Sequence, residues 1–136
     1  MAKQKKRQIK VPKAASAELM WKCSCGKEVA YTAKASHIDV AKDDGNLIGK
    51  MFSLAFVATE DGKPDTRRPV TFAFNGGPGS ASVAIDFGGI GPKRVQTNGF
   101  GHIRSDSPLE DNPHSILACT DIVFLDALAT DRKSVV

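Results

Sequence analysis

The sequence has few cysteines and no long apolar run, and it lacks the common nucleophile and phosphate motifs. Three cysteines in 136 residues are an odd number, which gives no disulfide framework and leaves the cellular compartment undetermined. No apolar run is long enough to span a membrane, and no apolar stretch follows the charged N-terminus, so we expect neither a transmembrane segment nor a signal peptide. The patterns G-x-S-x-G and G-x-x-x-x-G-K-[ST] are absent, which argues against a nucleophile elbow and a P-loop in this chain.

Basic charge is concentrated at the N-terminus. Residues 1–13 carry six of the 19 basic residues and no acid, so the remainder has 13 basic and 15 acidic residues. The net charge of +4 therefore belongs to a tail. No aromatic residue is interleaved with these lysines, which argues against nucleic-acid binding. We expect residues 1–26 to form a disordered basic leader.

The cysteines suggest no metal site. Cys23 and Cys25 form a C-x-C pair beside Trp21, whereas zinc sites use four ligands with C-x₂₋₄-C spacing, and only His37 lies nearby as a third candidate. We therefore interpret the two cysteines as a chance surface pair and expect no metal and no other cofactor. Cys119 precedes an apolar run, and we expect it to be a small core residue.

The pattern of strands and helices indicates an α/β fold. Residues 29–40 and 47–59, with a turn between them at 43–46, predict an antiparallel pair. The apolar runs 69–74 and 122–125 predict strands buried on both faces of a sheet, with a helix between them. This order suits the N-terminal part of an α/β-hydrolase sheet, with antiparallel strands first and parallel strands after. The remaining expectations are a polar loop at 60–67, a helix at 81–87 ended by Gly88-Gly89, a type I′ hairpin at Asn98-Gly99, a loop at 105–113 and one helical turn at 115–117.

The most informative stretch is Asn-Gly-Gly-Pro-Gly-Ser at residues 75–80, between the predicted strand and helix. Glycine loses the most conformational entropy on folding, so such a turn is worthwhile where backbone N–H groups must face a ligand or a developing negative charge. The residues leave four interpretations open. They are an oxyanion-hole turn after the third strand, a phosphate cradle, a purely structural turn and a nucleophile elbow. Ser82 in place of a third glycine weakens the second, and the absence of G-x-S-x-G argues against the last.

A resemblance to the serine carboxypeptidases, and in particular to their bacterial relatives, is carried by the segment RPVTFAFNGGPGSASVAIDFGGIGPKRV. It extends over residues 31–126. The resemblance implies that Gly77 supplies an oxyanion-hole N–H and that Asn75 binds the free C-terminal carboxylate of a peptide substrate. An amide suits that role because it donates hydrogen bonds without titrating. Gly76 would keep the backbone close to the peptide. The alternative for Asn75 is a side chain that caps the turn.

The sequence also departs from the family. Many eukaryotic members have Trp two positions before the motif Asn and Glu in the following helix, where this chain has Ala73 and Gly89. The family nucleophile, in Gly-Glu-Ser-Tyr, and the catalytic Asp and His have no counterpart here. His102, near Ser105 and Asp106, is interpreted as a solvated loop residue.

The expected function is that of a serine-type carboxypeptidase, which releases C-terminal residues from peptides. We expect the chain to be an N-terminal fragment that lacks the catalytic Ser, Asp and His and is inactive alone. Its expected partner is a peptide with a free carboxylate, and no nucleic acid or membrane; the oligomeric state is open. The alternatives are a glycine-loop nucleotide-binding module and a non-catalytic α/β-hydrolase-like binding protein. Residues 27–130 are expected to be the partial hydrolase domain, and residues 131–136 resemble a translated sequencing-adapter artefact.

Overall fold

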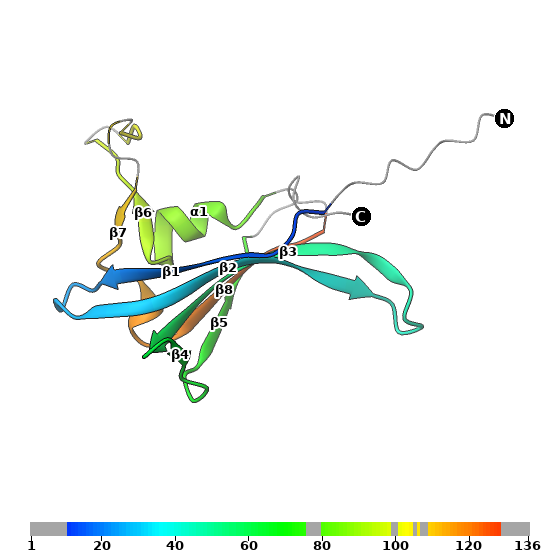
Figure 1. Cartoon of the computed structure of the whole chain (residues 1–136). Helices are drawn as coiled ribbons and strands as arrows, with labels where there is room; N and C mark the ends of the chain where they lie inside the picture. The colour runs from blue at the N-terminus through cyan, green and yellow to red at the C-terminus, as the bar shows by residue number, and fades with distance from the viewer. Residues whose placement is uncertain (1–10, 76–79, 99–100, 105, 107–108, 129–136) are drawn as a thin grey trace.

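A computed structural model describes residues 11–75, 80–98, 101–104, 106 and 109–128. One mixed sheet has the strand order β1-β2-β3-β8-β5, with β4 paired to β3, and a smaller sheet is formed by β6 and β7. The helical segments and the small sheet lie over one face of the large sheet (Figure 1). The strands are β1 (Ala15–Lys22), β2 (Glu28–Ala41), β3 (Leu47–Glu60), β4 (Lys63–Pro64), β5 (Val70–Ala73), β6 (Lys93–Val95), β7 (Leu109–Asp111) and β8 (Asp121–Asp126), and the helical segments are α1 (Val83–Ile85), the π-helical η1 (Asp86–Ile90) and the 3₁₀ turn η2 (Ile116–Ala118).

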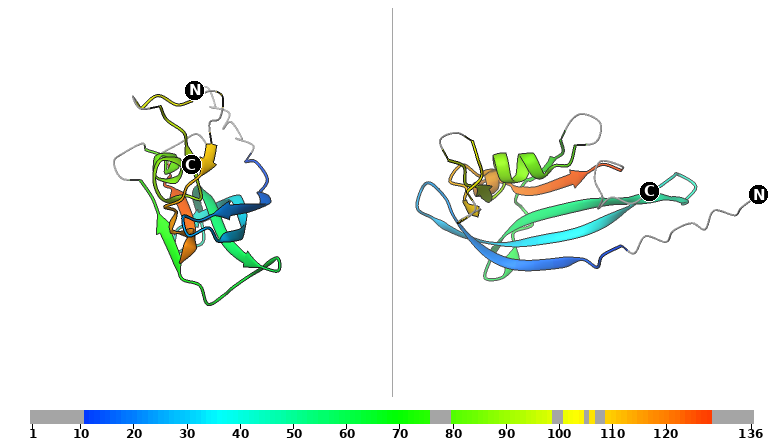
Figure 2. Two further views of the ribbon diagram at one scale, coloured as in Figure 1. Left: turned by 90° about the vertical axis from the view of Figure 1, so that its left-hand side faces the viewer. Right: turned by 90° about the horizontal axis from the view of Figure 1, so that it is seen from above.

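β2 and β3 form a long antiparallel pair. Their register runs from Ala30 opposite Thr59 to Ala41 opposite Leu47. In the turn between them, Gly45 has a φ of +82°, a backbone conformation that glycine adopts at no steric cost. The two predicted strands, their antiparallel pairing and the turn are therefore confirmed. Figure 2 shows this pair reaching beyond the rest of the sheet.

The expectation of a disordered leader over residues 1–26 is wrong for its second half. β1 pairs with β2 along its whole length, from Ala15 opposite Ala35 to Lys22 opposite Glu28. Trp21 is only 1% exposed. Pairing with a neighbouring strand and the burial of one large aromatic side chain stabilise this segment, although its sequence shows no periodicity. Residues 1–10 lie outside the described part of the chain, and the division into domains stays a prediction.

β8 lies inside the sheet and β5 lies at its edge. β8 pairs in parallel with β5 and antiparallel with β3, and its Ile122 and Phe124 are almost fully buried, as predicted. The strand expected at residues 69–74 is present as β5, but its expected burial on both faces is wrong, because Val70 and Phe72 are 50% and 62% exposed. No described segment pairs with the outer edge of β5 or covers the face that carries these two side chains. The open parallel edge is therefore that of β5.

The core lies between the sheet and the segments that cover its other face. The rings of Tyr31 and Phe124 each meet the ring of Phe56 edge to face, with centroids 5.9 Å apart. Leu117 of η2 is fully buried in the same cluster. Cys119, expected in the core, is exposed instead, because it follows η2 after Leu117 has already filled the buried position.

Several connecting segments differ from the expectations in detail. The hairpin at residues 93–111 is closed by bonds from Asn98 N–H to His102 O and from Gly101 N–H to Asn98 O, each 2.9 Å. Its loop is thus longer than the two-residue type I′ turn, and Gly101 takes the positive φ of +81°. Gly99 lies outside the described residues. The helical segment continues through Gly88 and Gly89 as a π-helical turn, where the sequence predicted its end. The expected loops at 60–67 and 105–113 contain β4 and β7. The predicted helical turn at 115–117 appears as η2.

The exposed phenyl ring on β5 generates a prediction about self-association. An open strand edge beside exposed apolar side chains favours pairing with another chain. Phe72→Lys should weaken concentration-dependent self-association of the purified chain by about tenfold in Kd, the equivalent of about 1.4 kcal/mol. Sedimentation velocity over a concentration series measures this change.

Ile103→Lys is the matched control, because Ile103 is also highly exposed, at 66%, but lies on the β6–β7 hairpin. It should leave the association constant unchanged. Equal weakening by both substitutions would show that added charge, and not the β5 edge, governs association.

Candidate active site

The glycine turn lies at the carboxyl edge of the two parallel strands. β5 ends at Ala73 and the chain reaches Asn75 two residues later, while α1 begins at Val83. β8 ends beside it with Asp126. In open α/β sheets ligands bind outside the carboxyl ends of the strands, so this is where a site is expected. Gly76 and Gly77 lie outside the described residues, and their predicted roles stay predictions.

Asn75 bridges the two ends of the turn. Its side-chain amide donates a hydrogen bond to the carbonyl oxygen of Ala81 over 3.3 Å. The side chain is nevertheless exposed. An amide group has two N–H donors and one acceptor, which is chemistry suited to binding a carboxylate. The contact is also what a turn-capping side chain makes, so both interpretations of Asn75 remain.

Asp126 holds the far end of the turn. One of its carboxylate oxygens accepts hydrogen bonds from the backbone N–H and the hydroxyl of Ser82, each at 2.6 Å. Both residues are buried. Hydrogen bonds to a carboxylate are stronger than neutral ones, so this pair fastens the start of α1 to the end of β8.

Asn112 and Ser115 bind the carbonyl groups at the end of the π-helical turn. The Asn112 amide donates to Gly89 O at 2.7 Å and to Gly91 O at 2.8 Å, and the Ser115 hydroxyl donates to Ile90 O at 2.8 Å. Helix ends leave carbonyl groups without intrahelical partners, and these bonds satisfy them. Gly91 is required for space, since a Cβ there would lie 2.0 Å from an Asp86 carboxylate oxygen.

Asp86 and Tyr31 are two buried polar groups with an unusual environment. Burial raises the pKa of Asp86 to about 7, and burial followed by the charges of Asp111 and Asp86 raises the pKa of Tyr31 to about 12. Within the described residues, neither the Tyr31 hydroxyl nor either Asp86 oxygen has a hydrogen-bond partner. Asp86 is therefore largely neutral below neutral pH, which relieves the cost of burying its charge.

An open cavity of about 890 Å³ lies between the helical segment and the β6–β7 hairpin. Apolar side chains from both sides line it, and so do charged and amide groups. Arg94 and Gln96 both donate to the carboxylate of Glu110, at 2.6 Å and 2.7 Å. Its lining includes Val83, Ala84, Phe87, Gly88, Ile103 and Arg104.

The structure assembles no triad or metal centre from the described residues. His102 is exposed on the hairpin, and the nearby Asp106 pairs with Arg104 at 2.6 Å. Within the described ranges, no group of three or more His, Cys, Asp and Glu residues is placed to hold a metal ion. None of the helices in those ranges has the length and apolar character needed to cross a bilayer.

Comparisons with known proteins agree with this geometry. The family model of the serine carboxypeptidases matches residues 26–129. The chain belongs to the serine carboxypeptidase family. Among solved structures it is similar to Kex1(delta)p, a prohormone-processing carboxypeptidase from Saccharomyces cerevisiae, with 25% identity and a TM-score of 0.56. The match covers 74% of this chain and 20% of the Kex1(delta)p chain, so this chain spans only a small part of that protein. No curated protein matches the chain.

The family match confirms the resemblance to the serine carboxypeptidases. The mixed sheet and its similarity to Kex1(delta)p confirm the partial α/β-hydrolase-like fold. The role predicted for Asn75 stays a prediction, and the sequence offered little reason to single out Asp126, Ser82 and Asn112, which hold the segments around it. The only local signal was that polar residues stand where apolar runs end, at Ser82 and at Asp126. Their partners lie far away in sequence, so the pattern alone could not pair them.

The Asp126–Ser82 contact generates a prediction about stability. Asp126→Leu removes the acceptor and leaves a buried N–H and a buried hydroxyl without a partner, which should cost about 2–4 kcal/mol of unfolding free energy. Ser82→Ala is the matched control, because it loses only the hydroxyl bond and should cost about 1 kcal/mol. Urea unfolding measures both, and equal losses would show that the backbone N–H does not depend on Asp126.

Asp86 generates a prediction about pH. Its pKa is about 7 in the folded chain against an ordinary value of 3.8 for an aspartate, so between these values the unfolded chain has lost a proton that the folded chain keeps. This contribution to stability is complete below pH 3.8 and is lost as pH rises through about 7. Asp86→Asn, which never ionises, should stabilise the protein by up to about 4 kcal/mol at pH 8 and hardly at pH 4.

Urea unfolding at both pH values provides the measurement. Asp106→Asn is the control, because Asp106 is exposed and its pair with Arg104 is screened by solvent, so the stability should change little at either pH. A gain for Asp86→Asn that is equal at pH 4 and pH 8 would show that the carboxyl group does not titrate between them.

Proposed function

We propose that this chain forms part of a serine-type carboxypeptidase and contributes one side of its substrate site. The observation that carries the proposal is the position of Asn75. It is exposed at the carboxyl edge of β5, immediately before the glycine turn, in a chain of the serine carboxypeptidase family. The neighbouring cavity gives room for a peptide beside the helical segment.

In this proposal the turn recognises the end of the peptide and the charge that forms during its cleavage. The Asn75 amide donates to the free C-terminal carboxylate of the substrate, and the backbone N–H of Gly77 stabilises the oxyanion of the tetrahedral intermediate. Gly76, without a side chain, lets the peptide approach the backbone. Asp126 and Ser82 fasten the segment that follows, which keeps these donors in place.

The proposal assigns the nucleophile and its base to residues that this sequence does not contain. The sequence has no G-x-S-x-G, and its structural match covers only 20% of the Kex1(delta)p chain. The chain thus supplies binding and electrostatic stabilisation, and the hydrolytic step requires a serine, a histidine and an aspartate from elsewhere.

The test is Asn75→Ala in a longer polypeptide that joins this chain to the downstream family segments with the Gly-Glu-Ser-Tyr nucleophile and the catalytic Asp and His. Losing one hydrogen bond to a charged group is worth about 1.5–3 kcal/mol. KM for peptides with a free carboxylate should therefore rise by roughly 10- to 100-fold. KM for the corresponding amidated or ester substrates should change little, because they lack the carboxylate.

Two controls sharpen this experiment. Asn46→Ala, in the exposed turn between β2 and β3, should leave KM unchanged for both substrate kinds. The 136-residue chain alone should hydrolyse no blocked dipeptide. Equal losses on carboxylate and amide substrates would show that Asn75 shapes the turn through Ala81 and does not bind the carboxylate.

A further inference from the structure

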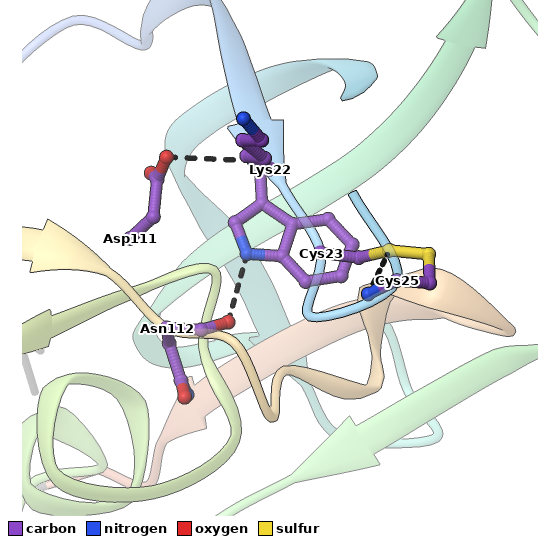
Figure 3. Close-up of a disulfide and its surroundings, with 6 residues drawn as sticks. Lys22, Cys23, Cys25, Asp111 and Asn112 are labelled. Atoms are coloured by element: carbon purple, nitrogen blue, oxygen red, sulfur yellow. Dashed lines mark hydrogen bonds between the residues drawn. A yellow bond between two sulfur atoms is a disulfide. The ribbon is translucent and has the colours of Figure 1, made fainter. Parts of the chain in front are cut away.

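The turn between β1 and β2 contains a disulfide that the proposed peptidase function does not use. Cys23 and Cys25, interpreted above as a chance surface pair, are bonded to each other with only Ser24 between them (Figure 3). The turn adjoins the segments that precede β5 and β8, since Arg68 and Ala118 share a cavity with it. It therefore lies at the opposite end of the parallel strands from Asn75.

The disulfide contributes little that the backbone does not already supply. The turn is closed by bonds from Cys23 N–H to Lys27 O at 2.9 Å and from Gly26 N–H to Cys23 O at 3.0 Å. Gly26 has the positive φ of +81° that this turn requires. The loop-closure entropy that a cross-link removes from the unfolded chain rises with loop length, so a separation of two residues gives only a small effect. A purely stabilising role is therefore a weak explanation for the bond.

The two sulfur atoms are in different environments. Cys23 is 8% exposed and belongs to the core cluster, whereas Cys25 is exposed. The backbone N–H of Cys25 donates to the sulfur of Cys23 over 3.1 Å (Figure 3). A thiolate from solution can thus reach Cys25, and the N–H stabilises negative charge on Cys23 as the leaving group.

A cavity of about 400 Å³ adjoins the disulfide and has side chains of both charge signs. Lys27 and Arg68 line it together with Glu28, Glu60 and Asp65. A volume of this size accommodates a small peptide. Groups of both signs suit a peptide thiol that carries an amino group and carboxylates, as glutathione does.

We propose that Cys23 and Cys25 form a thiol–disulfide exchange site that reacts with low-molecular-weight peptide thiols. The incoming thiolate attacks the sulfur of Cys25, a mixed disulfide forms there, and the Cys23–Cys25 bond breaks with Cys23 leaving as a thiolate. A second thiolate attacks the peptide's sulfur in the mixed disulfide and releases Cys25. Two thiols are oxidised to one disulfide, and the protein disulfide is reduced to two thiols, which take up the two protons that the attacking thiols gave to solvent.

The experiment uses the 136-residue chain with Cys119→Ser, which removes the exposed third thiol. Trp21, the single tryptophan, is buried in the same cluster as Cys23 and reports on the bond, because disulfides quench indole fluorescence. Under native conditions, Trp21 fluorescence should rise as the ratio of reduced to oxidised glutathione is increased and the disulfide is reduced. The midpoint should depend on the squared concentration of reduced glutathione divided by the concentration of oxidised glutathione, because two thiols react for each disulfide.

The direction of attack is tested by trapping. In the same background, Cys23→Ser should take one glutathione from oxidised glutathione at Cys25, and Cys25→Ser should react at Cys23 roughly tenfold more slowly. Alkylation of the partly reduced Cys119→Ser protein, followed by peptide mass analysis, should place the mixed disulfide on Cys25, and this result does not depend on the folding of either variant.

Three results would overturn the proposal. The bond could resist glutathione until the chain is unfolded by urea, which would make it purely structural. Cys23 and Cys25 could form mixed disulfides equally fast, which would contradict the assigned direction. The air-oxidised chain could contain two free thiols at these positions. None of these results bears on Asn75 or on peptide cleavage.

Discussion

The burial of Asn112 is the constraint on which most of this structure depends. This one residue is 2% exposed and satisfies polar groups from two segments that are distant from its own in the sequence. Its side-chain amide donates to the carbonyl oxygens of Gly89 and Gly91 at the end of the π-helical turn. Its backbone carbonyl oxygen accepts a hydrogen bond from the indole N–H of Trp21 at 2.8 Å. A buried polar group is costly unless its hydrogen bonds are made, so these segments must come together around it. β1, the helical segment and the loop before η2 are thereby fixed to one another.

The sheet has two unlike faces as a consequence. The face toward Asn112 is covered by the helical segment and carries the aromatic cluster of Tyr31, Phe56 and Phe124. The other face exposes Val70 and Phe72 on β5. A strand with a free edge and exposed apolar side chains is a surface suited to further strands or to another chain. The length of Kex1(delta)p, of which this chain matches 20%, shows how much more polypeptide one related carboxypeptidase has.

The two proposed sites lie at opposite ends of the parallel strands and differ in their chemistry. Asn75 and the Asp126–Ser82 contact stand at the carboxyl ends, and the Cys23–Cys25 turn stands near the start of β5 and β8. In open α/β sheets ligands bind outside the carboxyl ends of the strands, and this is the end at which we propose peptide recognition. The disulfide begins two residues after Trp21, whose indole donates to Asn112. Asn112, which organises the fold, therefore also contacts the segment that carries the disulfide.

Elements with a local sequence pattern could be predicted without the structure. Period-two alternation predicted β2 and β3, the apolar run at 122–125 predicted β8, and the turn at 75–80 identified the family and the position of Asn75. Tertiary structure alone decided which residues are buried and paired. β1 lacks alternation and is held by β2 and by Trp21, and the disulfide depends on a turn that brings Cys23 and Cys25 together. Asp126 meets Ser82, 44 positions away, and Asn112 meets Trp21, 91 positions away. Hydrogen bonds and burial between such distant segments leave no periodic trace in the chain, because each requires only one polar or aromatic residue at each end.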